Sequence, residues 1–77
     1  MKYSKKDFAI KLKQQLAGGY DVVKVSRWAY QEYLVHCRKL ESGLKPEIMK
    51  VIAMEEGPEF EMTEPEIQKF TNDLETQ

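Results

Sequence analysis

The 77-residue sequence has few of the residues that build catalytic and metal centres. It contains one cysteine, Cys37, and one histidine, His36. A lone cysteine excludes an intramolecular disulfide and is typical of a reducing compartment. A structural zinc site needs about four nitrogen or sulfur ligands, which this chain cannot supply. Adjacent residues on a helix point in different directions, so His36 and Cys37 do not form a nucleophile–base pair.

Other signatures of function are missing too. The sequence has no glycine-rich phosphate loop, and Gly18-Gly19 is typical of a helix end. The stretch "EEGPEFEMTEPE" lacks the alternating Asp and Asn ligands of a calcium-binding EF-hand loop. No apolar run approaches the roughly 18–20 residues of a membrane span, and "MKYSKKDFAIKLK" lacks the apolar core of a signal peptide. We therefore expect a cytoplasmic, non-enzymatic protein with no cofactor, no metal ion and no membrane segment.

The charges are distributed unevenly, although the formal net charge is only −1. Residues 1–54 contain eleven Lys and Arg against five Asp and Glu, whereas residues 55–77 contain one against eight. Two explanations remain open. Either the halves neutralise each other across the fold or a dimer interface, or the molecule presents a basic and an acidic pole to partners.

Helix signals account for most of the chain. The capping boxes "SKKD" and "TEPE" mark two helix starts, and apolar residues follow each at helical spacing. The β-branched run from Val22 to Val25 would suit a strand, but no second strand pattern exists to pair with it. The sequence predicts one all-α domain over residues 1–77, a compact bundle of four short helices. Their expected ranges are Lys5–Ala17, Asp21–Ser42, Pro46–Glu56 and Glu64–Glu75.

The second predicted helix has a broad apolar face and a polar, mostly basic face. Trp28 and Val35 lie seven residues apart and therefore share one side, which is the polar one. Either this helix is buried on two sides, or Trp28 is an exposed anchor of the kind that is common at binding hot spots. The apolar face is expected to comprise Val22, Val25, Ala29, Tyr33, His36, Cys37 and Leu40.

The stretch from Met54 to Glu66 holds six glutamates and no lysine or arginine. Glu64 and Glu66 lie at a helix N-terminus, where negative charge is stabilising. Local structure does not explain the other four, which surround one aromatic residue. We therefore consider a partner-binding surface that also includes Trp28. The alternative is that the carboxylates only balance the basic helices and that the aromatic ring folds back onto the core. The candidate residues are Glu55, Glu56, Glu59, Phe60, Glu61 and Trp28.

The favoured function is binding of a basic partner protein, as a module of immunity, antitoxin or adaptor type. An acidic surface that carries an aromatic residue fits a basic cleft in both charge and shape. The alternative is a nucleic-acid-binding accessory protein that uses the basic first and second helices. The sequence pI of about 5.8 and the acidic C-terminal part argue against nucleic acid. The sequence is also compatible with a homodimer.

Overall fold

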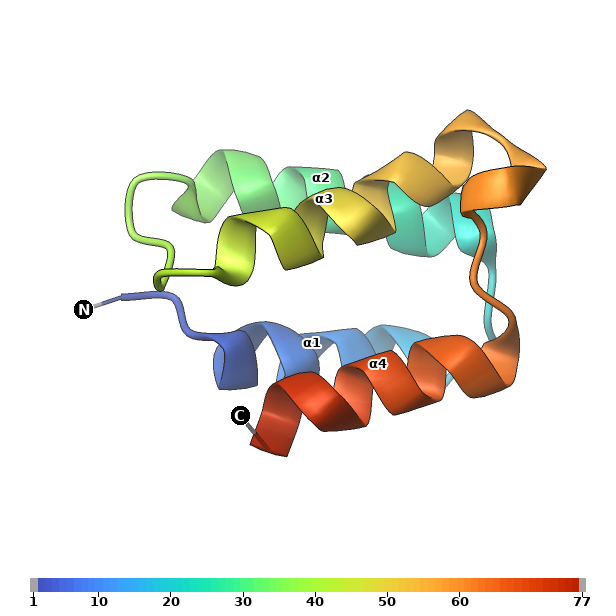
Figure 1. Cartoon of the computed structure of the whole chain (residues 1–77), viewed down its shortest axis with the longest axis horizontal. Helices are drawn as coiled ribbons and strands as arrows, with labels where there is room; N and C mark the ends of the chain where they lie inside the picture. Colours follow the sequence, from blue (N-terminus) through green and yellow to red (C-terminus); the bar gives the residue numbers. More distant parts are fainter. Residues whose placement is uncertain (1, 77) are drawn as a thin grey trace.

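The computed structural model describes residues 2–76, which form two layers of paired helices. In one layer α1 packs beside α4, and in the other α2 packs beside α3 (Figure 1). The prediction of a small all-α bundle is confirmed. The α-helices are α1 (Lys5–Leu16), α2 (Val22–His36), α3 (Leu44–Ala53) and α4 (Glu64–Thr76), and two 3-10 helices, η1 (Met54–Glu56) and η2 (Pro58–Phe60), connect α3 with α4.

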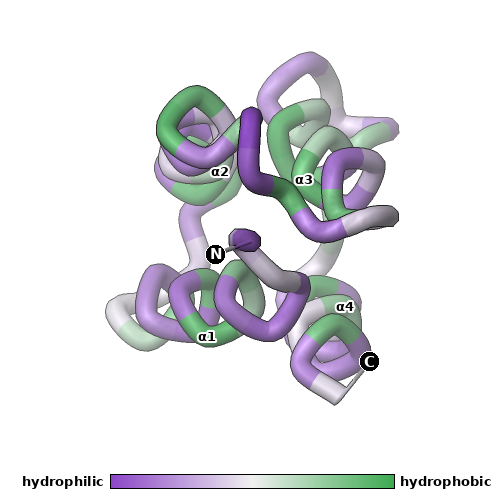
Figure 2. Tube along the Cα trace, turned by 90° about the vertical axis from the view of Figure 1, so that its left-hand side faces the viewer, coloured by the Kyte–Doolittle hydropathy of each residue, from purple (hydrophilic) through white to green (hydrophobic). Residues whose placement is uncertain are grey.

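The core lies between the two layers and receives side chains from all four α-helices. Figure 2 looks along the helices and shows them at the corners of a rough square. Burial of this apolar surface is the main favourable contribution to folding. The fully or almost fully buried apolar residues are Tyr3, Phe8, Ala9, Leu12, Val25, Ala29, Leu44, Ile48, Val51, Met54, Ile67 and Leu74.

The two predicted capping boxes are confirmed at the level of single hydrogen bonds. The Ser4 hydroxyl accepts from the Asp7 amide at 3.0 Å, and the Asp7 carboxylate accepts from the Ser4 amide at 3.1 Å. Thr63 and Glu66 make the same reciprocal pair at 3.3 and 2.8 Å. Asp21 caps α2 by accepting from a backbone amide three residues later. Each cap satisfies amides that have no partner inside their helix.

The predicted end of the second helix was wrong. α2 ends at His36 rather than at Ser42, and the chain turns inward to pair with the N-terminal segment. The Tyr3 amide donates to the Lys39 carbonyl at 2.6 Å, and the Glu41 amide donates to the Tyr3 carbonyl at 2.8 Å. This isolated bridge replaces the helical hydrogen bonds that a longer α2 would have made.

The early end of α2 also changes which side chains face the core. Cys37, which was expected on the inner face, is exposed, whereas Leu40 packs against the core cluster. Glu32 is not among the residues expected on the apolar face, but its carboxylate accepts a hydrogen bond from the Tyr3 hydroxyl at 2.7 Å. Lys11 lies 3.4 Å from the same carboxylate. Glu32 therefore lies on the inner side of α2, beside α1.

The third helix starts two residues earlier than predicted. Gly43 adopts a φ of 87°, a left-handed conformation that favours glycine, and α3 begins directly after it at Leu44. Pro46 therefore occupies the third helical position, where its missing amide hydrogen costs no helical hydrogen bond. The last predicted turn of this helix is η1, a tighter 3-10 turn.

Candidate functional site

The acidic residues of the candidate surface lie on one loop whose two ends are fixed to the core. We call residues 55–61 the acidic loop. Met54, just before it, is buried, and Met62, just after it, packs against the core. The Tyr20 hydroxyl donates to the Met62 carbonyl at 2.7 Å and lies 3.4 Å from the Met54 sulfur. One tyrosine between α1 and α2 thus holds both ends of the loop.

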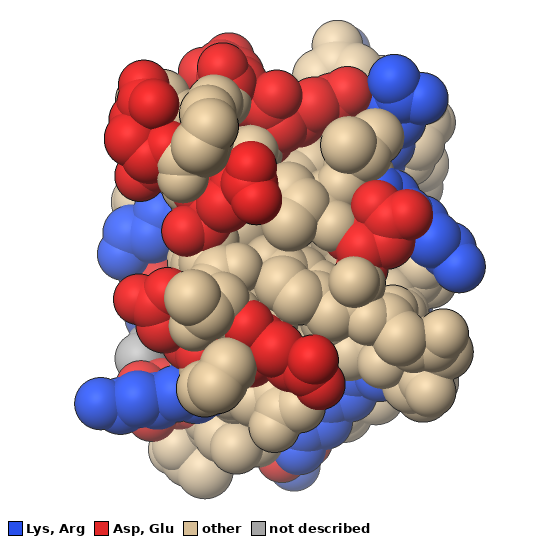
Figure 3. Space-filling model, turned by 90° about the vertical axis from the view of Figure 1, so that its right-hand side faces the viewer, with Lys and Arg blue, Asp and Glu red and all other residues tan. Residues whose placement is uncertain are grey.

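The glutamates of the acidic loop are exposed and gather at one end of the molecule. Figure 3 shows this end, where Asp and Glu dominate and Lys and Arg lie toward the edges. Glu55 pairs with Arg27 of α2, with 3.1 Å between Oε1 and Nε. Within residues 2–76, Glu56, Glu59 and Glu61 make no ion pair. The counter-charge explanation therefore accounts for Glu55 but not for the other three.

Phe60 lies in η2 among these carboxylates and does not fold back onto the core. Its side chain is 49% exposed, which is unusual for a large aromatic residue. The structure therefore brings Phe60 together with Glu56, Glu59 and Glu61 on one exposed loop. The alternative in which the ring is buried is not found.

Two pKa shifts report the electrostatics of this end of the molecule. Burial, followed by the negative charges of Glu61 and Glu66, raises the pKa of the Tyr20 hydroxyl above its ordinary value. Hydrogen bonds from the backbone and side chain of Thr63 lower the pKa of the Glu66 carboxyl. At neutral pH the Tyr20 hydroxyl therefore keeps the proton that it donates to the Met62 carbonyl, and Glu66 is the carboxylate that accepts from the Thr63 amide.

A shallow hollow lies next to the acidic loop, along the first turns of α4. Its volume is about 450 Å³. Its walls combine apolar side chains with two carboxylates and one amine, so it suits a long side chain that has an apolar stem and a positive end. The lining residues are Met62, Glu66, Lys69, Phe70 and Asp73.

Trp28 does not belong to this surface. Its ring stacks on Phe8 of α1, with centroids 5.2 Å apart and an interplanar angle of 17°. It packs against the core cluster, whereas Val35, on the same side of α2, is 70% exposed. Of the two alternatives for Trp28, the structure has the one in which α2 is buried on two sides.

A second exposed surface was not identified from the sequence. Val23, Tyr30 and Leu34 of α2 are 45%, 49% and 50% exposed. With Arg27 they form a row at spacings of four, three and four residues, which we call the outer α2 stripe. This spacing could have revealed the stripe, but the sequence does not tell which side of an apolar helix will be covered.

Metal-binding features are not found in the part of the chain that the structure describes. Residues 2–76 contain no group of three or more His, Cys, Asp and Glu side chains that could hold a metal ion. Every buried side-chain nitrogen and oxygen among them has a hydrogen-bond partner. None of the helices described is long and apolar enough to cross a membrane.

No family model, no curated protein and no solved structure matches this chain.

Proposed function

We propose that this protein is a non-enzymatic module that binds a basic partner protein through the acidic loop. The observation that carries the proposal is Phe60, half exposed among three carboxylates that have no counter-charge among the described residues. An exposed aromatic ring gains hydrophobic free energy when a partner covers it. Aromatic anchors are common at binding hot spots, and charges of one sign around an anchor attract a partner of the opposite sign.

The way the loop is held also supports this function. Because Tyr20, Met54 and Met62 fix its ends, less conformational entropy is lost when a partner binds. The neighbouring hollow, with Glu66 and Asp73 in its walls, would accept a lysine or arginine of that partner. An immunity, antitoxin or adaptor role is compatible with such a small acidic binder, and a cytoplasmic location fits the exposed thiol of Cys37.

The test compares two variants that remove the same charge from different places. The first is Glu59→Gln with Glu61→Gln, and the control is Glu47→Gln with Glu75→Gln on α3 and α4. A basic partner would be captured from the native extract with the wild-type protein and identified. Its association rate with each variant would then be measured by surface plasmon resonance at low and high salt.

We expect the loop variant to associate several-fold more slowly at low salt and the control to match the wild type. The difference should shrink at high salt, because screening weakens attraction between exposed charges. Phe60→Ser should mainly speed dissociation, since it removes the anchor. Equal rates for both double variants, or copurification of nucleic acid in place of a protein, would contradict the proposal.

A further inference from the structure

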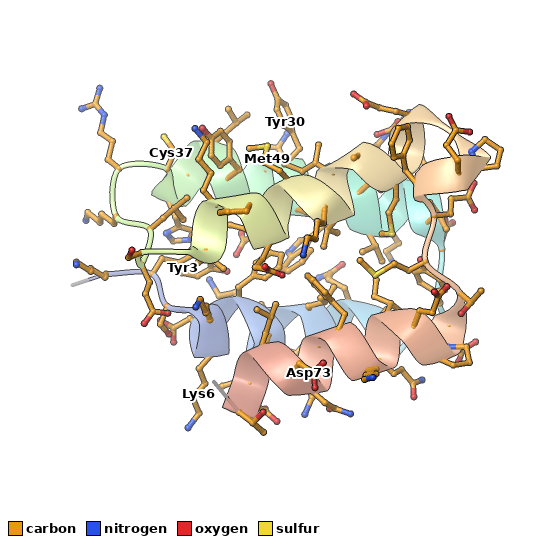
Figure 4. The ribbon with its side chains drawn as sticks, viewed as in Figure 1. Tyr3, Lys6, Tyr30, Cys37, Met49 and Asp73 are labelled. Carbon is orange, nitrogen blue, oxygen red and sulfur yellow. The ribbon has the colours of Figure 1, made fainter. Side chains whose placement is uncertain are left out.

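The outer α2 stripe lies on the side of α2 that faces away from α1 and α4. Figure 4 shows Tyr30 pointing outward from this layer. The opposite side of α2 carries Val25 and Ala29, both fully buried. Val23, Tyr30 and Leu34 therefore present apolar surface that no other described element covers.

α3 extends this apolar surface on one side. The Ser26 hydroxyl donates to the Val51 carbonyl at 3.0 Å, and the Lys45 amine lies 6.0 Å from the centre of the Tyr33 ring. These two contacts show that α3 runs antiparallel to α2. Met49, one turn after Lys45, therefore lies on the same side of α3 as Lys45, the side beside α2. Met49 is partly exposed.

The charges around the stripe are mainly positive. Lys24 in α2 and Arg38 just after its end are exposed and make no ion pair within residues 2–76. Arg27 in the stripe pairs with Glu55 at the border of the acidic loop. A ligand for this surface therefore needs apolar groups at its centre and negative charge at its edges.

We propose that the outer α2 stripe, together with Met49, binds an acidic amphipathic helix of a partner protein. Alternating spacings of four and three residues are those of a seam along which two helices pack side by side. From Val23 to Leu34 the seam extends about 16 Å, or three helical turns. Carboxylates on the partner helix would face Lys24 and Arg38 at its two ends.

A second copy of the chain is a poorer occupant. Two outer α2 stripes placed face to face, parallel or antiparallel, bring Lys24 and Arg38 against lysines and arginines of the other copy. Like charges facing each other across an interface are unfavourable. The acidic loop of another copy offers one apolar side chain, Phe60, and not a helical row.

The outer α2 stripe is a different surface from the acidic loop, and its proposed partner is acidic rather than basic. The proposed binding is tested with a synthetic helical peptide of about three heptads that has leucine at its seam positions and glutamate beside them. A second peptide has lysine in place of glutamate. Binding is measured by fluorescence anisotropy, and the binding site is mapped by amide chemical-shift changes in the intact protein.

We expect the glutamate peptide to shift amides around Val23, Tyr30, Leu34 and Met49. Leu34→Ser should weaken its binding about tenfold or more while the protein stays folded, because Leu34 is half exposed and lies outside the core. Val35→Ser is the matched control, since Val35 is a more exposed apolar residue of the same helix outside the stripe. Its binding should equal that of the wild type. The Glu59→Gln, Glu61→Gln variant should also bind this peptide unchanged.

Several outcomes would overturn the inference. One is that the glutamate peptide does not bind at concentrations up to about 1 mM. A dissociation constant above that value is weaker than ordinary specific recognition. Another is equal affinity for the glutamate and lysine peptides at the stripe. A dimer of the free protein, seen by sedimentation and abolished by Leu34→Ser, would show that a second copy covers the stripe. If the protein bound anionic lipid vesicles or duplex DNA in place of the peptide, and Leu34→Ser abolished that binding, the outer α2 stripe would be assigned to a different class of ligand.

Discussion

Tyr3 shows how one side chain joins distant parts of this small chain. Its ring stacks on His36 at the end of α2, with centroids 4.0 Å apart, and meets Phe8 edge-on at 6.4 Å. Its hydroxyl donates to Glu32. Burial first, and then this hydrogen bond, raise the pKa of the hydroxyl above its ordinary value of 10.0. The contact with Glu32 is therefore fully formed at neutral pH.

Tyr3→Phe should lower the free energy of unfolding by about 1–3 kcal/mol, because it removes one hydrogen bond to a charged, largely buried carboxylate. Tyr30→Phe is the matched control, since the Tyr30 side chain is half exposed, and its effect should be close to zero. Urea denaturation at pH 7 measures both. Equal losses in the two variants would contradict the assigned role of Tyr3.

The pH dependence of this contribution has a definite sign. The folded state holds the Tyr3 proton more tightly than the unfolded state, so the stabilisation is complete below pH 10 and is lost as pH rises toward the raised pKa. The difference in the free energy of unfolding between the wild type and Tyr3→Phe should therefore become smaller in alkaline solution.

At the scale of single elements, the starts of the helices are determined by residues that are close in sequence. The start of α4 is an example, because Thr63 and Glu66 satisfy each other's backbone amides. The carboxylate form of Glu66 accepts the Thr63 amide, and its pKa is lowered for that reason. Its contribution to stability is thus complete above the ordinary pKa of 4.5 and is lost as pH falls through the lowered value.

An NMR titration of the Glu66 carboxyl carbon should give a midpoint below 4.5, the ordinary value for glutamate. Thr63→Val removes the hydroxyl but keeps the backbone amide, so it should move the midpoint part of the way back. Thr76→Val is the control, because the exposed Thr76 hydroxyl bonds within the same helix but at its other end, away from Glu66. A midpoint at or above 4.5 in the wild type would contradict the capping geometry.

At the scale of the whole molecule, the two layers depend on one shared core. α1 and α4 contribute Leu12 and Ile67, and α2 and α3 contribute Val25 and Ile48, all without exposed surface. Neither layer could bury these side chains alone. The stacked pair of Trp28 and Phe8 lies across the boundary between the layers.

Cooperative unfolding follows from this arrangement. The fluorescence of Trp28, which reports the contact between layers, and far-UV circular dichroism, which reports helix, should show the same midpoint in urea. Phe8→Leu should lower both midpoints together, because it removes the stacking partner and leaves space in the core. A loss of the fluorescence signal at clearly lower urea than the helix signal would show that the layers separate before they unfold.

Local sequence determined a large part of this fold. The two capping boxes, Asp21 before α2 and the helical spacing of apolar residues depend on neighbours three or four positions apart, which a sequence displays directly. The same is true of the charge of the acidic loop, because adjacent glutamates must be close in space. The all-α class and the position of the candidate surface could therefore be predicted.

Tertiary structure decided what depends on residues far apart in the chain. α2 ends at His36 because Tyr3 pairs with Lys39 and Glu41, a contact that spans more than thirty positions of sequence. The exposure of Phe60 and the covering of Trp28 by Phe8 depend equally on which helices pack together. An apolar residue on a helix has the same local signal whether a neighbouring helix covers it or solvent does, and only the packing of the layers distinguishes the two.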